Sequence, residues 1–179
     1  VTPESMQNYD DQLDKPAAER MRDFYYLNLF STLIGGEDQL RIKTMWALSN
    51  FLVISTRKVS EFGALEFFNL LQTHAFGQYG DLLKAVTRNP AMGSYLDNGQ
   101  NTKWQLNENY GRELMQLFSV GLIQLNLDGT PKRDASGKVL ETYSQKDVIE
   151  ITRALTGWDF VPNPTNLISN RNYPNFGKP

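Results

Sequence analysis

The sequence has no cysteine among its 179 residues and only one histidine, His74. The lack of cysteine excludes disulfide bonds, thiolate zinc sites and a cysteine nucleophile in this chain. One histidine cannot build a two-histidine metal site or a histidine-dependent catalytic relay by itself. Glycine-rich phosphate loops, nucleophile elbows and zinc signatures are also missing. We therefore predict no metal and no cofactor.

The sequence also lacks an excess of one charge and a long apolar run. Eighteen Lys and Arg oppose twenty Asp and Glu, which gives a formal net charge of -2. Because nucleic-acid binding is driven by a basic excess, we predict no nucleic-acid partner. The most apolar stretch, residues 45–54, is interrupted by Ser49 and Asn50 and is far shorter than the roughly 20 residues of a membrane span. We predict no membrane span.

Helical periodicity is the main pattern that is present. Apolar residues recur at helical spacing along most of the chain, which predicts a mostly α fold: a bundle of about six helices in a single domain over residues 16–158. Residues 45–54 are apolar on nearly every side and predict a helix at the centre of the bundle. Predicted N-caps are Asp38, Ser60, Asn89 and Asn107, and Ser144 with Asp147 forms a predicted capping box.

Other segments depart from this periodicity. Between residues 122 and 143, turn signals at 128–129 and 136–137 are flanked by alternating stretches, which predicts a small β-hairpin inserted in the helical domain. No internal repeat is evident, and residues 98–105 form a polar loop. Calcium is one interpretation of the oxygen-bearing Asp128, Asp134 and Ser136, but turn chemistry explains them equally well.

The two ends of the chain lack any period that could bury a face. Residues 1–15 form a predicted polar extension without the basic start and apolar run of a signal peptide. Residues 159–179 are rich in Pro and Asn and predict an irregular tail or linker. Because the chain starts at Val1 rather than at Met, we expect processing, proteolysis or an incomplete chain at this end.

The predicted helix that starts near residue 107 carries the first candidate site. On a helical wheel Glu108 and Arg112 lie opposite the apolar face, and Glu113 lies at its edge. A partly desolvated carboxylate with a raised pKa can act as a general acid or base, which makes Glu108, Arg112 and Glu113 candidate catalytic residues. The alternative is structural, because Glu108 and Arg112 have the spacing of an ordinary helix ion pair.

Trp158 and His74 are candidates for ligand binding. Trp158 follows Gly157 at the predicted end of the last helix, where an exposed indole would bind a sugar or a peptide. The alternative is that Trp158 packs back on its own helix. His74 precedes a predicted helix break, where it would either bind a ligand or cap the carbonyls of the helix end.

Four stretches of the sequence carry a resemblance to a known family. They are MWALSNFLVIS (45–55), AFGQYGDLLKAVTRNPAMGSYL (75–96), NENYGRELMQLFSVGL (107–122) and YSQKDVIEITRALTGW (143–158). In content, order and spacing they resemble the family called domain of unknown function 1800. The resemblance covers roughly residues 24–160.

This resemblance implies a long, mostly helical bacterial protein, commonly exported to the periplasm or the extracellular space. Family members are often encoded beside a second exported protein that is similar to sulfatases, so the resemblance implies such a partner. It also implies that this chain is an internal fragment. We expect an uncharacterised exported protein with a scaffold or binding role. The alternative is an exported enzyme, possibly hydrolytic, whose carboxylate site is completed by regions outside this chain.

Overall fold

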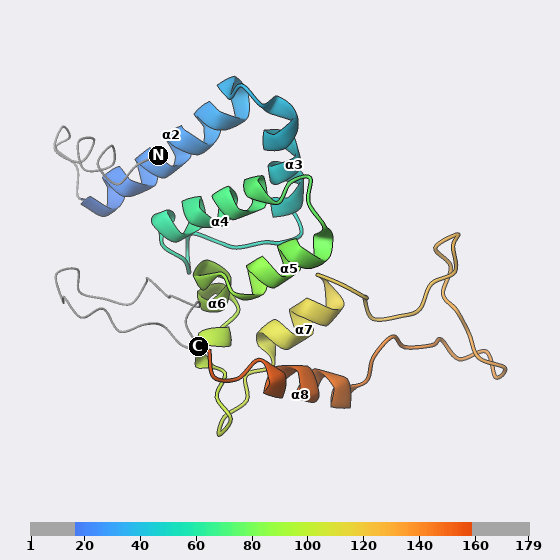
Figure 1. Cartoon of the computed structure of the whole chain (residues 1–179). Coiled ribbons are helices and arrows are strands. Elements are labelled where there is room, and N and C mark those ends of the chain that lie inside the picture. The colour runs from blue at the N-terminus through green and yellow to red at the C-terminus, as the bar shows by residue number, and fades with distance from the viewer. Residues whose placement is uncertain (1–16, 159–179) are drawn as a thin grey trace. The chain divides into compact units, whose positions relative to one another are not determined.

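The computed structural model of the chain describes residues 17–158, which are mostly helical (Figure 1). The helices are α2 (Ala17–Gly35), α3 (Gln39–Ser49), α4 (Glu61–Thr73), α5 (Tyr79–Thr87), α6 (Pro90–Tyr95), the 3-10 helix η1 (Asn98–Gln100), α7 (Asn109–Gln116) and α8 (Gln145–Ala154). The mostly α prediction is confirmed, with seven α-helices rather than about six among the described residues. The predicted extension at 1–15 and the tail at 159–179 lie outside the described residues.

The described residues form two compact units, unit 1 up to residue 85 and unit 2 from residue 86 onward. In unit 1 the helices α2, α3 and α4 pack against one another around an apolar interior. Its buried apolar residues are Phe24, Tyr25, Leu29, Leu33, Ile42, Met45, Leu52, Val59, Ala64, Phe67, Leu71 and Leu82. Full burial of one large apolar side chain contributes about 1.5–3 kcal/mol, so this interior is the main source of stability in unit 1.

Three of the predicted N-caps are confirmed. The side chains of Asp38, Ser60 and Asn89 accept hydrogen bonds from backbone N–H groups in the first turns of α3, α4 and α6, at 3.2, 3.1 and 2.9 Å. Each bond satisfies a donor that the helix itself leaves unpaired, which typically contributes about 1 kcal/mol. At the start of α6, Pro90 occupies the first helical position, where its missing N–H costs nothing.

The helix α3 ends earlier than the sequence predicted. It stops at Ser49, so residues 45–54 are not one central helix, and Trp46 and Phe51 are exposed rather than buried. The cause is local, because Ser49 Oγ and Asn50 Nδ2 both donate to the carbonyl of Trp46, at 2.7 and 2.8 Å. Side-chain donors of this kind compete with the backbone hydrogen bonds of a helix.

In unit 2 the helices α7 and α8 pack against each other closely. Gly111 permits the approach, because a Cβ atom there would lie 2.6 Å from Oγ1 of Thr152 on α8. The predicted capping box at the start of α8 is confirmed, since the backbone N–H of Ser144 donates to Oδ2 of Asp147 at 2.8 Å and the hydroxyl donates to it at 2.7 Å.

The start of α7 differs from the prediction, which placed the N-cap at Asn107. Its N-cap position is Glu108, and the helix ends at Gln116. Asn107 therefore lies one residue before the N-cap position. Its Oδ1 accepts a hydrogen bond from the backbone N–H of Asn109 at 3.1 Å. This short bond forms a turn before the helix instead of capping the first helical turn.

Residues 122–143, which we call the arm, extend away from α7 and α8 as the long orange trace in Figure 1. The predicted β-hairpin is not confirmed, because within the described arm only isolated antiparallel bridges occur. They are Ile123 with Glu141, Leu125 with Pro131, and Arg133 with Val139. Three different stretches thus pair with one another, whereas a hairpin would extend one pairing into a ladder.

The pairing in the arm repeats with a period of eight residues. The backbone N–H groups of Gln124, Leu140 and Lys132 donate in a ring, from Gln124 to Leu140 at 2.9 Å, from Leu140 to Lys132 at 2.9 Å and from Lys132 to Gln124 at 2.8 Å. A glycine with positive φ stands at the same place in each repeat, at Gly121, Gly129 and Gly137. Glycine adopts this backbone region without steric cost. The expectation of no internal repeat was wrong, because the repeat lies in the backbone pairing and preserves little more than glycine.

Candidate functional site

The charged cluster predicted around α7 is present, and it links α7 to α8. Arg112 Nη2 donates to Glu108 Oε2 and to Gln145 Oε1, at 2.7 Å in both cases. Gln145 Nε2 donates in turn to both carboxylate oxygens of Glu108, at 3.1 and 3.0 Å. The three side chains therefore form a closed hydrogen-bonded cluster between the start of α7 and the first residue of α8.

The electrostatics of this cluster favour the structural interpretation of Glu108 and Arg112. The hydrogen bond from the Gln145 side chain, and after it the bond and charge of Arg112, hold the pKa of Glu108 below its ordinary value. A general acid at neutral pH needs the opposite shift. Exposed ion pairs of this type contribute little to stability, and this cluster joins the start of α7 to the start of α8.

Glu113 has a different environment from its charged neighbours. It is half-buried, as its predicted position at the edge of the apolar stripe requires. Its Oε2 atom is buried and has no hydrogen-bond partner among the described residues. On the same side of α7, Tyr110 is fully buried, and its hydroxyl donates to Thr87 Oγ1 at 2.8 Å. A buried carboxylate oxygen without a partner costs free energy, which makes Glu113 the more unusual of the two glutamates.

His74 lies at the end of α4 in unit 1. Its backbone N–H donates to the carbonyls of Leu70 and Gln72, so His74 is the C-cap residue of the helix. These bonds come from the backbone, so capping of the carbonyls by the imidazole ring stays a prediction. The role of His74 in ligand binding stays a prediction.

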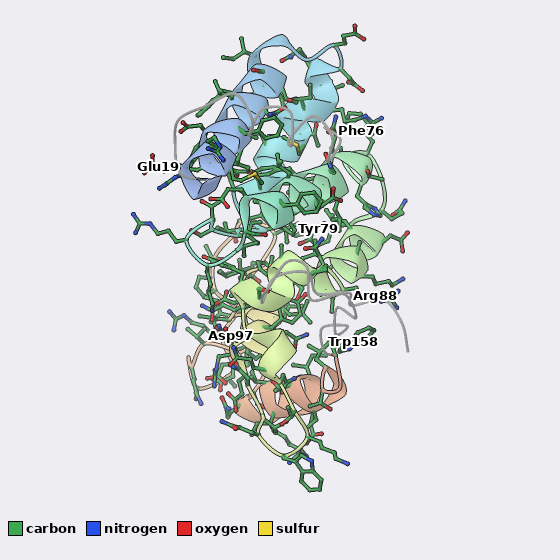
Figure 2. The ribbon with its side chains drawn as sticks, turned by 90° about the vertical axis from the view of Figure 1, so that its left-hand side faces the viewer. Glu19, Phe76, Tyr79, Arg88, Asp97 and Trp158 are labelled. Atoms are coloured by element: carbon green, nitrogen blue, oxygen red, sulfur yellow. The ribbon has the colours of Figure 1, made fainter. Side chains whose placement is uncertain are left out.

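Trp158 lines an open cleft in unit 2 that we call the tryptophan cleft. The residue follows the C-terminal end of α8 and is half-buried (Figure 2). The cleft has a volume of about 310 Å³, at the lower end of the range of about 300–1,000 Å³ for small-molecule sites. Its lining residues are Gly99, Asn101, Thr102, Lys103, Trp104, Thr156, Gly157 and Trp158.

A second indole lies in the loop that forms the other wall of the tryptophan cleft. Trp104 is 87% exposed, and Nζ of Lys103 lies 4.6 Å from the centroid of its ring. This is a cation–π contact, worth about 0.5–1 kcal/mol at an exposed site. Sequence reasoning named Trp158 but missed Trp104, because residues 98–105 were assigned only as a polar loop. The available signal was an indole in a segment with no apolar partner residues at helical or strand spacing.

The side chain of Asn101 holds the loop that carries Trp104 in its conformation. This side chain is buried, its Nδ2 donates to the carbonyl of Thr152 at 2.8 Å, and its Oδ1 accepts from the N–H of Asn107 at 3.1 Å. Thr102 and Gln105 also exchange two backbone hydrogen bonds, at 3.1 and 3.2 Å. The wall of the cleft is therefore held in place before any ligand arrives.

Unit 1 contains a shallower and more polar cleft of about 440 Å³, lined by Arg41, Asn69, Gln72 and Thr73. The guanidinium of Arg41 is already engaged, because Nη1 donates to the carbonyl of Gln72 at 3.2 Å and the group lies 4.8 Å from the ring centroid of Phe76. Neither of the two clefts is lined by Glu108, Arg112 or Glu113.

Over residues 17–158, no three side chains of the His, Asp and Glu type come together as metal ligands. In the same range, none of the helices combines the length and the apolar character needed to cross a bilayer.

Comparison with known proteins gives one result. Neither the curated proteins nor the solved structures yield a match to this chain. A family model described as "Protein of unknown function (DUF1800)" matches residues 3–176, which is nearly the whole sequence. The resemblance seen in the four sequence stretches is thereby confirmed, and the chain belongs to the DUF1800 family.

Proposed function

We propose that this chain is a binding and scaffolding module that engages a partner protein through its arm. The supporting observation is a group of exposed large apolar residues, which are 36% exposed or more, at the end of α7 and along the first stretch of the arm. They are Leu117, Val120, Leu122, Ile123, Leu125 and Leu127, the last of which is fully exposed. Grouped apolar surface of this kind is typical of protein interaction sites.

The backbone of the arm suits it to binding. The ring of hydrogen bonds among Gln124, Lys132 and Leu140 holds its three stretches together. A preorganised element loses less conformational freedom on binding than a flexible loop does, so more of its contact energy appears as affinity. The arm carries three basic and three acidic residues, which leaves apolar contact as its main means of recognition.

The proposed partner is a protein that presents an apolar groove to the arm. The family resemblance makes an exported sulfatase-like protein the first candidate, with the periplasm or the extracellular space of a bacterium as the place of the interaction. In this proposal the helices of unit 2 act as the base from which the arm extends.

Site-specific crosslinking tests the proposal. A photoreactive benzoylphenylalanine replaces Leu127 in the protein expressed in the cells that naturally make it, and the same group at Ala135 on the second turn of the arm is the matched control. We expect one defined protein adduct from position 127, reduced at least fivefold by Leu125→Asp, and none from position 135. Equal, diffuse labelling from both positions would contradict the proposal, provided that circular dichroism shows folded protein.

A second candidate function is hydrolysis that depends on Glu113. The observation that favours it is the buried, unpartnered Oε2 of this residue. The variant Glu113→Gln keeps the shape of the side chain, so a catalytic carboxylate predicts a loss of turnover at least 100-fold with little change in thermal stability. If Glu113→Gln alters stability and leaves every activity of the protein unchanged, Glu113 is structural.

A further inference from the structure

We infer that the tryptophan cleft of unit 2 is a carbohydrate site that takes an acidic oligosaccharide. This inference goes beyond the proposed partner binding, because it depends on the loop at 99–104 and on the end of α8 rather than on the arm. It rests on three features of the cleft: the exposed indole of Trp104, the charge of Lys103 and the pairing of its backbone.

The exposed indole is the first feature. An indole buries about 150–250 Å² when it is covered, and leaving so large an apolar side chain in water forgoes the stability that its burial would contribute. Trp104 is nevertheless 87% exposed on a loop whose conformation is fixed by Asn101. Trp158 faces the same cleft from the end of α8. The C–H groups of a pyranose ring form a flat apolar face that matches such an aromatic surface, whose π system attracts C–H groups.

The charge of the cleft is the second feature. Among the described residues that line it, Lys103 is the only charged one. Its ammonium group lies above the Trp104 ring, so a ligand that stacks beside this indole has a positive charge close by. Opposite charges attract across a short distance in water and attract more strongly near a protein surface. A sugar that carries a carboxylate therefore fits better than a neutral one.

The pairing of backbone and hydroxyl groups is the third feature. One mode of peptide binding adds a strand to a free sheet edge, and Thr102 and Gln105 do not offer such an edge because their backbone groups are already bonded to each other. Hydroxyl oxygens remain as acceptors, since the Thr156 hydroxyl donates to the Arg153 carbonyl at 2.9 Å and keeps its lone pairs for a ligand. Sugar hydroxyls, which donate readily, suit this surface better than a peptide does.

Tryptophan fluorescence of the whole chain, titrated with a galacturonic acid trisaccharide, tests the inference. A neutral galactose trisaccharide of the same length and a hexaglutamate peptide are the comparison ligands. We expect saturable binding of the acidic sugar, at least fivefold weaker binding of the neutral sugar, and no binding of the peptide.

Variants assign the binding to the cleft. Trp104→Ala removes an exposed side chain, so the fold should persist while the affinity for the acidic sugar falls at least tenfold. Lys103→Gln should lower the affinity for the acidic sugar about fivefold, which corresponds to a loss of about 1 kcal/mol in binding free energy. Its affinity for the neutral sugar should stay unchanged. The matched controls are Trp46→Phe in unit 1 and Lys138→Gln on the arm, and both should bind as the unmodified chain does.

Three results would overturn the inference. They are the absence of saturable binding of the acidic sugar at millimolar concentration, equal binding of the hexaglutamate peptide, and sugar binding that Trp104→Ala leaves unchanged in a folded protein. None of these results bears on the crosslinking at position 127, so this inference and the proposed function can fail separately.

Discussion

The interiors of the two units differ in how many polar side chains they bury. The buried side chains of unit 1 that the structure describes are all apolar and lie mainly on α2, α3 and α4. Unit 2 has fewer buried apolar side chains, and it contains all four of the buried polar ones, which are Asn89, Asn98, Asn101 and Thr152. Among the described residues, all three that have a buried side-chain polar atom without a partner also belong to unit 2, namely Asn98, Glu113 and Thr152.

We infer from this difference that the two units have different roles, one mainly in stability and the other in binding. An apolar interior stabilises a fold through its buried area alone, and it tolerates little change in volume. A polar interior depends on hydrogen bonds and leaves some groups unsatisfied, which is common near functional sites. The arm and the tryptophan cleft, on which our two proposals rest, both belong to unit 2.

The largest effect should come from the interior of unit 1. Phe67 on α4 is 0% exposed, and Phe67→Ala should lower the free energy of unfolding by about 3–5 kcal/mol. Its matched control is Phe30→Ala on α2, where the side chain is 54% exposed and the expected loss is below about 1 kcal/mol. Urea denaturation measures both. Similar losses for the two variants would mean that unit 1 has no distinct interior.

The next effect concerns the contact between α7 and α8. Gly111→Ala would place a methyl group 2.6 Å from Thr152 Oγ1, and overpacking of this kind typically costs about 1–3 kcal/mol. Gly80→Ala in α5 meets no atom within 4 Å and should leave the stability unchanged or raise it by up to about 1 kcal/mol.

A second substitution checks the cause assigned to Gly111. Thr152→Ala removes the atom that the new methyl group would meet, so it should recover part of the loss in a Gly111→Ala background. Thermal denaturation of the single and double variants measures this recovery. If the two losses simply add, Gly111 is required for another reason.

Substitutions at two asparagines test the polar interior of unit 2. Their effects on the free energy of unfolding should be smaller and opposite in sign. Asn98 and Asn101 are each 1% exposed, but only Asn101 has described partners for its side chain. Asn98→Leu should therefore raise the free energy of unfolding by about 1 kcal/mol, because a buried amide without partners is removed. Asn101→Leu should lower it by about 1–3 kcal/mol, because two backbone groups lose their partner. A large loss for Asn98→Leu would show that its amide is bound after all.

The smallest expected effects are changes in stability with pH. They should occur in alkali for unit 1 and in acid for the arm of unit 2. Burial raises the pKa of Tyr25 in unit 1 to about 12, so the stability that it contributes is complete below its ordinary pKa of about 10 and is lost as the pH rises toward 12. In the arm, hydrogen bonds from Thr130 and Ser136 lower the pKa of Asp128 and Asp134. Their contribution is present above an ordinary pKa of about 4 and is lost as the pH falls through the lowered values.

Backbone amide exchange across this pH range, followed by NMR after correction for the intrinsic rates, should show the arm weakening first in acid and unit 1 weakening first in alkali. The variant Asp134→Asn should remove part of the acid response of the arm while leaving the alkaline response of unit 1 as it was. A single transition common to both regions would contradict the separation.

Much of the helical fold could be predicted because its signals are local. The caps at Asp38, Ser60 and Asn89 are set by bonds that span two or three residues. The end of α3 could not be predicted, because Ser49 and Asn50 end a helix only when their side chains turn toward the backbone. The spacing of apolar residues, which continued to residue 54, gave the opposite signal.

The arm and the site depend on contacts between distant residues. The ring of the arm closes through Gln124 and Leu140, a pairing that no turn signal specifies. Within the site, the spacing of Glu108 and Arg112 predicted their ion pair, but Gln145, which bonds to both, comes from another helix. The tryptophan cleft likewise brings Trp158 to the same opening as a loop more than fifty residues earlier.

The two ends of the arm lie next to each other, because the backbone N–H of Thr142 donates to the carbonyl of Leu122 at 3.1 Å. Its own hydrogen bonds close before the chain returns to the helices. The arm can therefore be treated as an exchangeable part: a short linker between residues 121 and 144 should spare the helices, and the excised segment could be grafted into an exposed loop of another protein. Changes in the arm that alter partner choice would then be possible without any redesign of the helices beneath it.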